Sequence, residues 1–250
     1  MYDPAAFVRP PSWEAGDDPN PFAERKVKRN FLSGDLLHWQ KSARNLFAAI
    51  SHVDHHLGRV WDALKRSRHA ENTVVVIFSD HGYHVGEKQR FTKKSLWEQV
   101  ARVPVIIHAP GDSEPREVMQ SVALVDLAPT VLDYAGLDPL PGRIGQSLRP
   151  IVSGEPAPEK AVPTVLFGSA GVTKGDRRII RYRDGSTELF DLADDWWQLR
   201  NLGQQHDAFQ GMYDALQDSC RTYSLDLPDS DAVALHQEDS GAPALPATSA

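Results

Sequence analysis

The stretch VVVIFSDHGYHVGEKQRFTKKSLWEQVARVPVIIHAPG, residues 74–111, contains two apolar runs separated by a polar segment. The first run, Val74 to Phe78, is continuous and rich in β-branched residues, and the second, Val103 to Ile107, repeats the pattern. Continuous apolar runs of this length are typical of strands buried on both faces of a parallel sheet. A short helix is expected between them, around Ser95 to Val100. The stretch therefore predicts a βαβ construction in an α/β fold.

A long helix is predicted before this stretch, from about Asp35 to Arg66. Apolar residues recur there at alternating steps of four and three, which places one apolar stripe along the helix. The stripe consists of Leu46, Ile50, Val53, Leu57, Val60 and Leu64. Residues 1–30 are rich in proline and polar groups and have no such periodicity, so they predict a long irregular segment.

The second half of the chain has shorter segments and more turn residues. Asp126 is expected to cap a short helix that Gly136 ends. Two apolar arms flank Asp184-Gly185, a dipeptide that favours a tight hairpin, so residues 161–192 predict a small antiparallel unit. The segment after Ser224 has too little apolar content to form a core and is expected to be disordered.

Composition and charge exclude several classes of function. The chain of 250 residues is 41% hydrophobic and 24% charged, as in ordinary globular proteins. Its net charge of −7 gives no basic footprint for nucleic acid or an anionic membrane. No apolar run approaches the roughly 20 residues that span a bilayer, and no signal peptide is present at the first residue, so the cytoplasm is the default expectation. The single cysteine, Cys220, allows neither an internal disulfide nor a cysteine-built metal site.

The segment Ser79-Asp80-His81-Gly82 directly follows the first predicted strand. Ligands of open α/β sheets gather beyond the carboxyl ends of the strands, so this position favours a binding site. A carboxylate and an imidazole side by side are able to bind one divalent cation, and Gly82 lets the backbone bend beneath them. The structural alternative is a capped turn that contains a hydrogen-bonded histidine.

A cluster of cations follows the Asp-His pair: Lys88, Arg90, Lys93 and Lys94. Such a cluster is suited to a tetrahedral anion, since it stabilises charge on the anion's oxygens. The alternative is a solvated cationic loop. Arg90 is expected on the substrate side of the pocket, and His84 and Glu87 either support the site or only fix the loop.

With these residues in view, the stretch resembles the second conserved block of the sulfatases, in the alkaline phosphatase superfamily. The likeness is greatest to the bacterial branch similar to iduronate-2-sulfatase. The blocks FAAISHVDHHLGRVWDAL, SVALVDLAPTVLDYAGL and RYRDGSTELFDLADDWWQLRNL also resemble sulfatase segments, in the order of the family. The resemblance extends over about residues 1–202.

The resemblance implies specific roles for three residues. Asp80 and His81 match the family's ligands of one calcium ion, and Lys93, thirteen residues after Asp80, matches the catalytic lysine that contacts the sulfate group. We add Arg90 as a substrate-binding residue. The family's nucleophile is a formylglycine made from a C/S-x-P-x-R signature, which does not occur in this sequence, since Cys220 lacks the proline and the arginine.

The resemblance also implies an architecture. We expect an alkaline-phosphatase-like, mostly parallel sheet flanked by helices, incomplete here, with a small antiparallel C-terminal subdomain. The predicted parts are the C-terminal portion of the catalytic domain at residues 1–138, the subdomain at 139–223 and a disordered tail at 224–250. The first residues resemble the interior of a full-length sulfatase, so the sequence is expected to hold about half of an active site.

The leading functional hypothesis is a sulfuric ester hydrolase that uses calcium and acts on a sulfated small molecule or carbohydrate, with this chain inactive alone. One alternative is a phosphodiesterase or phosphonate monoester hydrolase with two zinc ions, for which His84, His108 and Asp126 are available ligands. Another is a non-catalytic binding module. The expected partners are the missing N-terminal half or a second copy of the chain, without nucleic acid or membrane.

Overall fold

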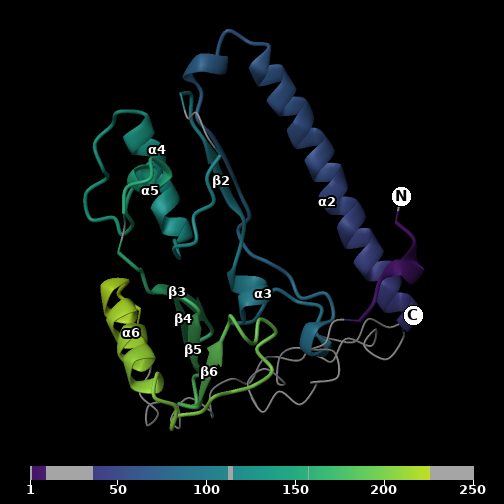
Figure 1. The fold of residues 1–250 in the computed structure, drawn as a ribbon, viewed down its shortest axis with the longest axis vertical. Coiled ribbons are helices and arrows are strands. Elements are labelled where there is room, and N and C mark those ends of the chain that lie inside the picture. The colour runs from purple at the N-terminus through teal and green to yellow at the C-terminus, as the bar shows by residue number, and fades with distance from the viewer. Residues whose placement is uncertain (1, 10–35, 112–114, 157, 226–250) are drawn as a thin grey trace, which may run out of the picture.

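The computed structural model describes residues 2–9, 36–111, 115–156 and 158–225 (Figure 1). Residues 10–35 lie outside these ranges, and with them most of the irregular segment predicted at residues 1–30. Residues 226–250, nearly all of the disordered tail predicted at 224–250, also lie outside them. Among the described residues, the helices and strands of the first half are accompanied by the short 3-10 turns η1 (Pro4–Ala6), η4 (Ala70–Asn72) and η5 (Glu87–Gln89).

Helix α2 spans Leu36–Lys65, which confirms the helix expected from the apolar stripe. Only Trp39 and Ala43 are buried on it, against Phe7, Val85 and Phe91. The Trp39 indole N–H donates to the carbonyl oxygen of Val85 over 2.6 Å. The first turns of α2 are therefore anchored, whereas the stripe further along is largely exposed. None of the helices in the described ranges is long and apolar enough to cross a membrane.

Strands β1 (Val75–Phe78) and β2 (Val105–His108) confirm the two predicted strands, but they pair with each other antiparallel, with Val75 opposite His108. The parallel βαβ arrangement is therefore wrong for this pair. The connection explains the difference: its helix α3 (Glu98–Ala101) has only four residues, too short to carry the chain back along a strand. The chain instead enters β2 from the end at which it left β1.

The ribbon of β1 and β2 is also more exposed than predicted. Phe78 is 53% exposed and Ile106 is 56% exposed, and these two side chains lie on opposite faces of the ribbon by the pairing register. Among the described residues the ribbon has two strands only, and these two exposed side chains show that neither face is fully covered.

The middle of the chain forms η6 (Leu124–Asp126) and helices α4 (Leu127–Tyr134) and α5 (Arg149–Val152). Helix α4 and its end at Gly136, which has a φ of 67°, confirm the prediction. Asp126 does not cap α4 with its side chain. Its buried carboxylate accepts instead from the Ala123 and Gln146 amides and from Lys160, because this cation lies 2.7 Å away.

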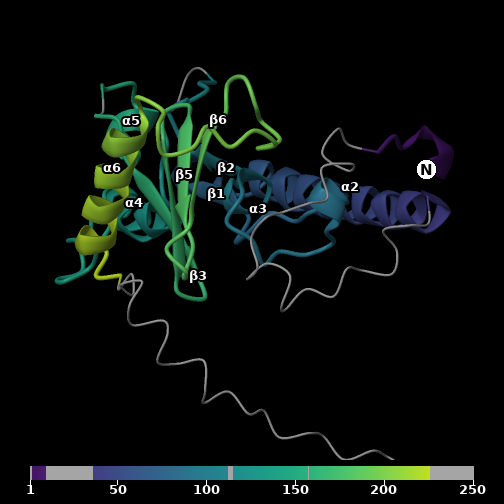
Figure 2. The same cartoon turned by 90° about the horizontal axis from the view of Figure 1, so that it is seen from below.

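The C-terminal part is a four-stranded antiparallel sheet, in the order β3 (Val162–Leu166), β4 (Ser169–Lys174), β5 (Arg177–Arg181) and β6 (Thr187–Asp191). The β5–β6 hairpin confirms the predicted turn, since Gly185 has a φ of 85°. Helix α6 (Phe209–Thr222) lies along one face of the sheet (Figures 1 and 2).

The two faces of this sheet contact different parts of the chain. Val172, Ile179 and Leu189 pack with α6 in one core cluster. On the other face, Ile180, Tyr182 and Phe190 pack against Leu96 and Trp97, just after the predicted cationic loop. The second face therefore supports the candidate site.

Candidate functional site

The loop after β1 carries Asp80 and His81 and is held by short hydrogen bonds. The Ser79 hydroxyl donates to the carbonyl oxygen of His81 over 2.9 Å. The His81 amide donates to Asp80 Oδ1 over 3.0 Å. The Gly82 amide donates to the carbonyl oxygen of Val100, in α3, over 2.8 Å. These bonds fix the backbone at the carboxyl end of β1.

Gly82 brings this loop directly against α3. A Cβ atom at Gly82 would lie 2.2 Å from the carbonyl oxygen of Gln99, far inside a van der Waals contact. A larger residue would therefore push the loop and the helix apart, and it would move the two candidate ligands beside it.

Asp80 and His81 turn their side chains toward each other. Asp80 Oδ2 and His81 Nε2 are 3.6 Å apart, with the Asp80 side chain 80% exposed. His81 Nδ1 lies 2.8 Å from the carbonyl oxygen of Gly82. Because a carbonyl oxygen only accepts, Nδ1 would carry the proton in a neutral ring, and Nε2 would keep its lone pair. A lone pair and a carboxylate oxygen then face each other, an arrangement that a cation between them stabilises.

The pair fits part of a divalent cation site. Calcium takes six to eight oxygen ligands, whereas Asp80 and His81 supply one carboxylate and one nitrogen. In the described ranges no group of three or more His, Cys, Asp or Glu side chains is close enough to hold a metal. The described residues therefore offer two candidate ligands and not a full shell.

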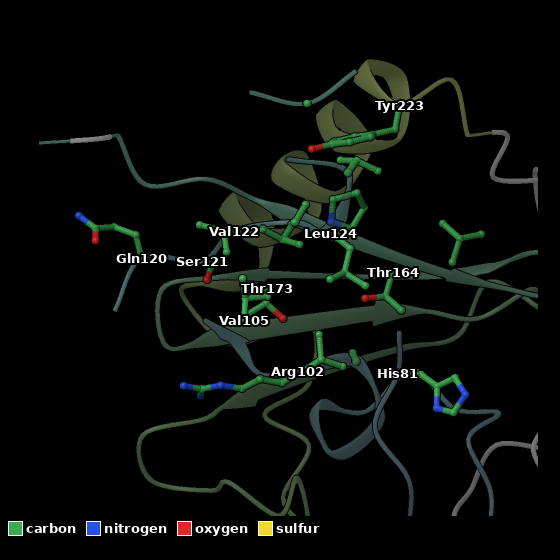
Figure 3. A pocket seen from close by; sticks show the side chains of 18 of the residues that line it. His81, Arg102, Val105, Gln120, Ser121, Val122, Leu124, Thr164, Thr173 and Tyr223 are labelled. Atoms are coloured by element: carbon green, nitrogen blue, oxygen red, sulfur yellow. The ribbon is translucent and has the colours of Figure 1, made fainter. Parts of the chain in front are cut away.

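Lys93 lines the same cleft as Asp80 and His81. The cleft has a volume of about 1820 Å³ and opens between the β1–β2 ribbon, the region of α4 and the C-terminal sheet. Figure 3 shows His81 and Arg102 on one side of it and Tyr223 on the opposite side. The amine of Lys93 is on an exposed residue, so it is able to meet an anion from solution.

The other predicted cations do not line this cleft. Arg90 is only 8% exposed, and its guanidinium stacks over the ring of Trp97, 5.2 Å from the centroid. Lys88 donates to the carbonyl oxygen of Gln198 over 2.6 Å. Lys94 lies 5.9 Å from the ring centroid of Phe167. Packing explains Arg90 better than substrate contact, and of these four cations Lys93 alone lines the cleft.

His84 and Glu87 fix the loop between Gly82 and Lys93. The fully buried His84 ring hydrogen-bonds through Nε2 to the Ser95 hydroxyl over 2.7 Å, and burial lowers its pKa. Glu87 accepts from the amide of Val85. Burial opposes the ionisation of Glu87, but the His84 ring, with Nδ1 3.7 Å from Glu87 Oε2, and hydrogen bonds from backbone amides hold its pKa below the usual value.

A buried network that the sequence did not indicate ties this region to the C-terminal sheet. Arg178, in β5, is 1% exposed and donates to the carbonyl oxygen of Leu96 over 2.7 Å and to Glu98 Oε1 over 2.8 Å. The Gln198 side chain accepts from the Glu98 amide over 2.7 Å. Because Leu96 and Glu98 follow Lys93 directly, the network anchors the segment that carries the catalytic candidate.

The residues available for a two-zinc site are dispersed. His84 is buried in the loop, the His108 ring contacts the Trp61 ring at 4.9 Å, and Asp126 is paired with Lys160. The described geometry gives no support to a site built from these three side chains.

Family models identify the class of protein that this fold and site define. The model described as "Sulfatase" matches residues 6–137, and the model of the C-terminal region of N-sulphoglucosamine sulphohydrolase matches residues 86–223. The chain belongs to the sulfatase family.

Individual relatives agree with this assignment. A sulfatase of Formosa agariphila is 33% identical over 159 residues, which cover 63% of this chain and 31% of that protein. A protein solved with its substrate D-glucosamine-2-N,6-O-disulfate is 23% identical with a TM-score of 0.67, covering 81% and 44% of the two chains. The phosphonate monoester hydrolase of Silicibacter pomeroyi is 23% identical with a TM-score of 0.75, covering 88% and 51%.

These matches confirm the α/β sulfatase-like fold class. They also show that the chain spans about a third of this curated relative and about half of the solved structures.

Proposed function

We propose that this chain provides one side of a sulfate ester hydrolysis site, with Lys93 as the catalytic residue that contacts the sulfate group. The observation that carries the proposal is that Asp80, His81 and Lys93, from separate parts of one loop, line a single cleft. All three residues lie in the region that the sulfatase family model matches.

Each of the three side chains has a distinct task in the proposal. Asp80 and His81 Nε2 would hold a calcium ion, which supplies positive charge beside the sulfate oxygens when it is bound. The ammonium group of Lys93 donates hydrogen bonds to a non-bridging oxygen, where negative charge increases as the ester bond breaks. The Gly82 carbonyl keeps His81 in the required tautomer. The formylglycine nucleophile has no precursor signature in this sequence and would come from the part of a sulfatase outside the match.

The substrate class that we propose is a sulfated carbohydrate or another small sulfate ester. The likeness to a protein solved with a disulfated glucosamine supports a sugar, and the open cleft of about 1820 Å³ has room for one. Phosphonate monoester hydrolase remains the second candidate because one such enzyme shares the fold. The phosphonate monoester hydrolase is only 23% identical to this chain, whereas the Formosa agariphila protein, which is 33% identical, is a sulfatase.

The test is a chimera in which this chain replaces the matching part of the Formosa agariphila sulfatase. We expect it to hydrolyse p-nitrophenyl sulfate or glucosamine 6-sulfate. Lys93→Ala should lower kcat by roughly 100- to 1000-fold, as when one stabilising donor is lost. Lys94→Ala is the matched control, since this neighbouring cation does not line the cleft. Unchanged turnover in Lys93→Ala, or a preference for phenylphosphonate over both sulfates, would refute the proposal.

A further inference from the structure

The turn between β3 and β4 carries an exposed phenylalanine at the rim of the cleft. Phe167 and Gly168 form this two-residue turn, since Leu166 and Ser169 on either side of them are paired. Phe167 is 57% exposed. Thr164 and Leu166, just before it in β3, line the cleft, and Figure 3 shows Thr164 among the lining side chains. The turn therefore lies where β3 leaves the wall of the cleft.

The backbone of this turn is better suited to other residues than phenylalanine. Phe167 has a φ of 50° and Gly168 a φ of 76°. Two-residue hairpin turns with positive φ at both positions are most often Asn-Gly, because larger side chains are strained in this conformation. A residue other than glycine that is held in such a conformation is typical of ligand sites. The phenylalanine at this position therefore indicates a role for its exposed ring.

Two contacts place the turn beside the segment that carries the candidate catalytic lysine. The Lys94 ammonium lies 5.9 Å from the centroid of the Phe167 ring. Leu166 packs against the core cluster that contains Leu96. Lys93 directly precedes Lys94 in the chain and lines the cleft. A ligand that is bound at Lys93 and extends out of the cleft on this side therefore meets the Phe167 ring.

We propose that Phe167 stacks against a second sugar ring, next to the one that bears the sulfate, so that the substrate is an oligosaccharide. One face of a pyranose ring presents C–H groups that pack on a flat aromatic ring, while the hydroxyl groups at its edge stay in water. The Lys94 ammonium beside the ring suits an acidic group on this second sugar. We name the Phe167 ring and the Lys94 ammonium together the Phe167 subsite. The inference rests on the proposed function, because it takes the sulfated ring to lie at Lys93.

The test compares the binding of two sugars to the full 250-residue chain by saturation-transfer NMR titration. The probes are glucosamine 6-sulfate and a disaccharide in which a second glucosamine is attached to it. We expect the disaccharide to bind about tenfold more tightly, with saturation reaching the C–H protons of both of its rings. Phe167→Asn should remove this advantage and leave the affinity for the monosaccharide unchanged. Phe167→Trp should retain the advantage, since it keeps a flat aromatic face.

Two further measurements separate stacking from a change in the fold. Asparagine tolerates a positive φ, so the Tm of Phe167→Asn should equal or exceed that of the unsubstituted chain. Phe167→Leu keeps an apolar side chain without an aromatic face, and it should also lose the advantage of the disaccharide. Phe47→Leu, which removes a 44% exposed ring on helix α2, is the matched control and should change neither affinity.

Several outcomes would overturn the Phe167 subsite. They are equal affinities for the two sugars, an advantage of the disaccharide that survives in both Phe167→Asn and Phe167→Leu, and the absence of saturation transfer to the second ring. Lys93→Ala distinguishes this inference from the proposed function, because loss of the sulfate contact should weaken both sugars by the same factor. If Lys93→Ala changes neither affinity while Phe167→Asn still removes the advantage, the proposed function is wrong and the subsite remains.

Discussion

Arg178 is the buried residue on which the link between the C-terminal sheet and the Lys93 segment depends. Its partner Glu98 is almost as buried, at 5% side-chain exposure. Arg178→Met should therefore leave a carboxylate uncompensated and lower the free energy of unfolding by about 3–5 kcal/mol, measured by urea denaturation. The neighbouring Arg177 pairs with Asp191 but is 35% exposed, so Arg177→Met should lose less than about 1 kcal/mol. Equal losses would contradict the role of burial.

His84 should make stability depend on pH. Burial lowers the pKa of His84 in the folded chain, while the unfolded chain keeps a value near 6.5. As the pH falls below about 6.5, the unfolded state takes up a proton that the folded state resists, so stability decreases. Between pH 7.5 and 5.5 the Tm of His84→Gln should change less than that of the unsubstituted chain. His55→Gln, on the exposed side of α2, should keep the original pH dependence.

Single residues were predictable from the sequence where their partners are near in the chain. Asp80 and His81 are adjacent in the sequence, so their proximity in the structure was predictable from the motif alone. Arg178 and Glu98 are 80 positions apart, and an arginine in a strand gives no sign that it is buried. Asp126 has the sequence of a helix cap, but a lysine 34 positions later binds its carboxylate.

The contact between the Asp80 loop and helix α3 should tolerate no side chain at Gly82. A Cβ atom there meets backbone, which yields less than a flexible side chain. Gly82→Ala should lower the free energy of unfolding by about 1–3 kcal/mol in a urea titration. Gly58→Ala is the control, because nothing lies within 4 Å of its Cβ position inside α2. That substitution should raise stability by about 0.5–1 kcal/mol through helix propensity. A loss in both variants would show that the close approach is not the cause.

Whole elements were predictable in type but not in direction. The helix predicted from the apolar stripe agrees with α2 to within one residue at each end, because the periodicity of apolar residues is a local property of the chain. The strands were also found, but their mutual direction depends on the connection between them. The segment that connects β1 to β2 has few apolar residues to cover a sheet. The apolar sequences of the two strands do not show whether the strands run parallel or antiparallel.

Packing is uneven over the whole molecule. The C-terminal sheet is covered by α6 on one face and by Leu96 and Trp97 on the other, and Ile179, Ile180 and Leu189 are fully buried. The far part of α2 has no comparable cover, because its apolar stripe is exposed. The free energy needed to open a region increases with the apolar surface that opening exposes. The C-terminal sheet and the far part of α2 should therefore differ in local stability.

Hydrogen exchange of the full chain measures this difference. Strand β5 is bonded to β4 and β6, so amides of Ile179 and Ile180 should exchange only through global unfolding, at about 5–15 kcal/mol. Amides from Ile50 to Val60 should open locally at a few kcal/mol, roughly 1–3, because fraying there exposes little new apolar surface. Raising the urea concentration should accelerate exchange steeply in β5 and hardly in α2. If both regions shared one urea dependence, α2 would be part of the same cooperative unit as the sheet, and its exposed stripe would have to be covered in solution.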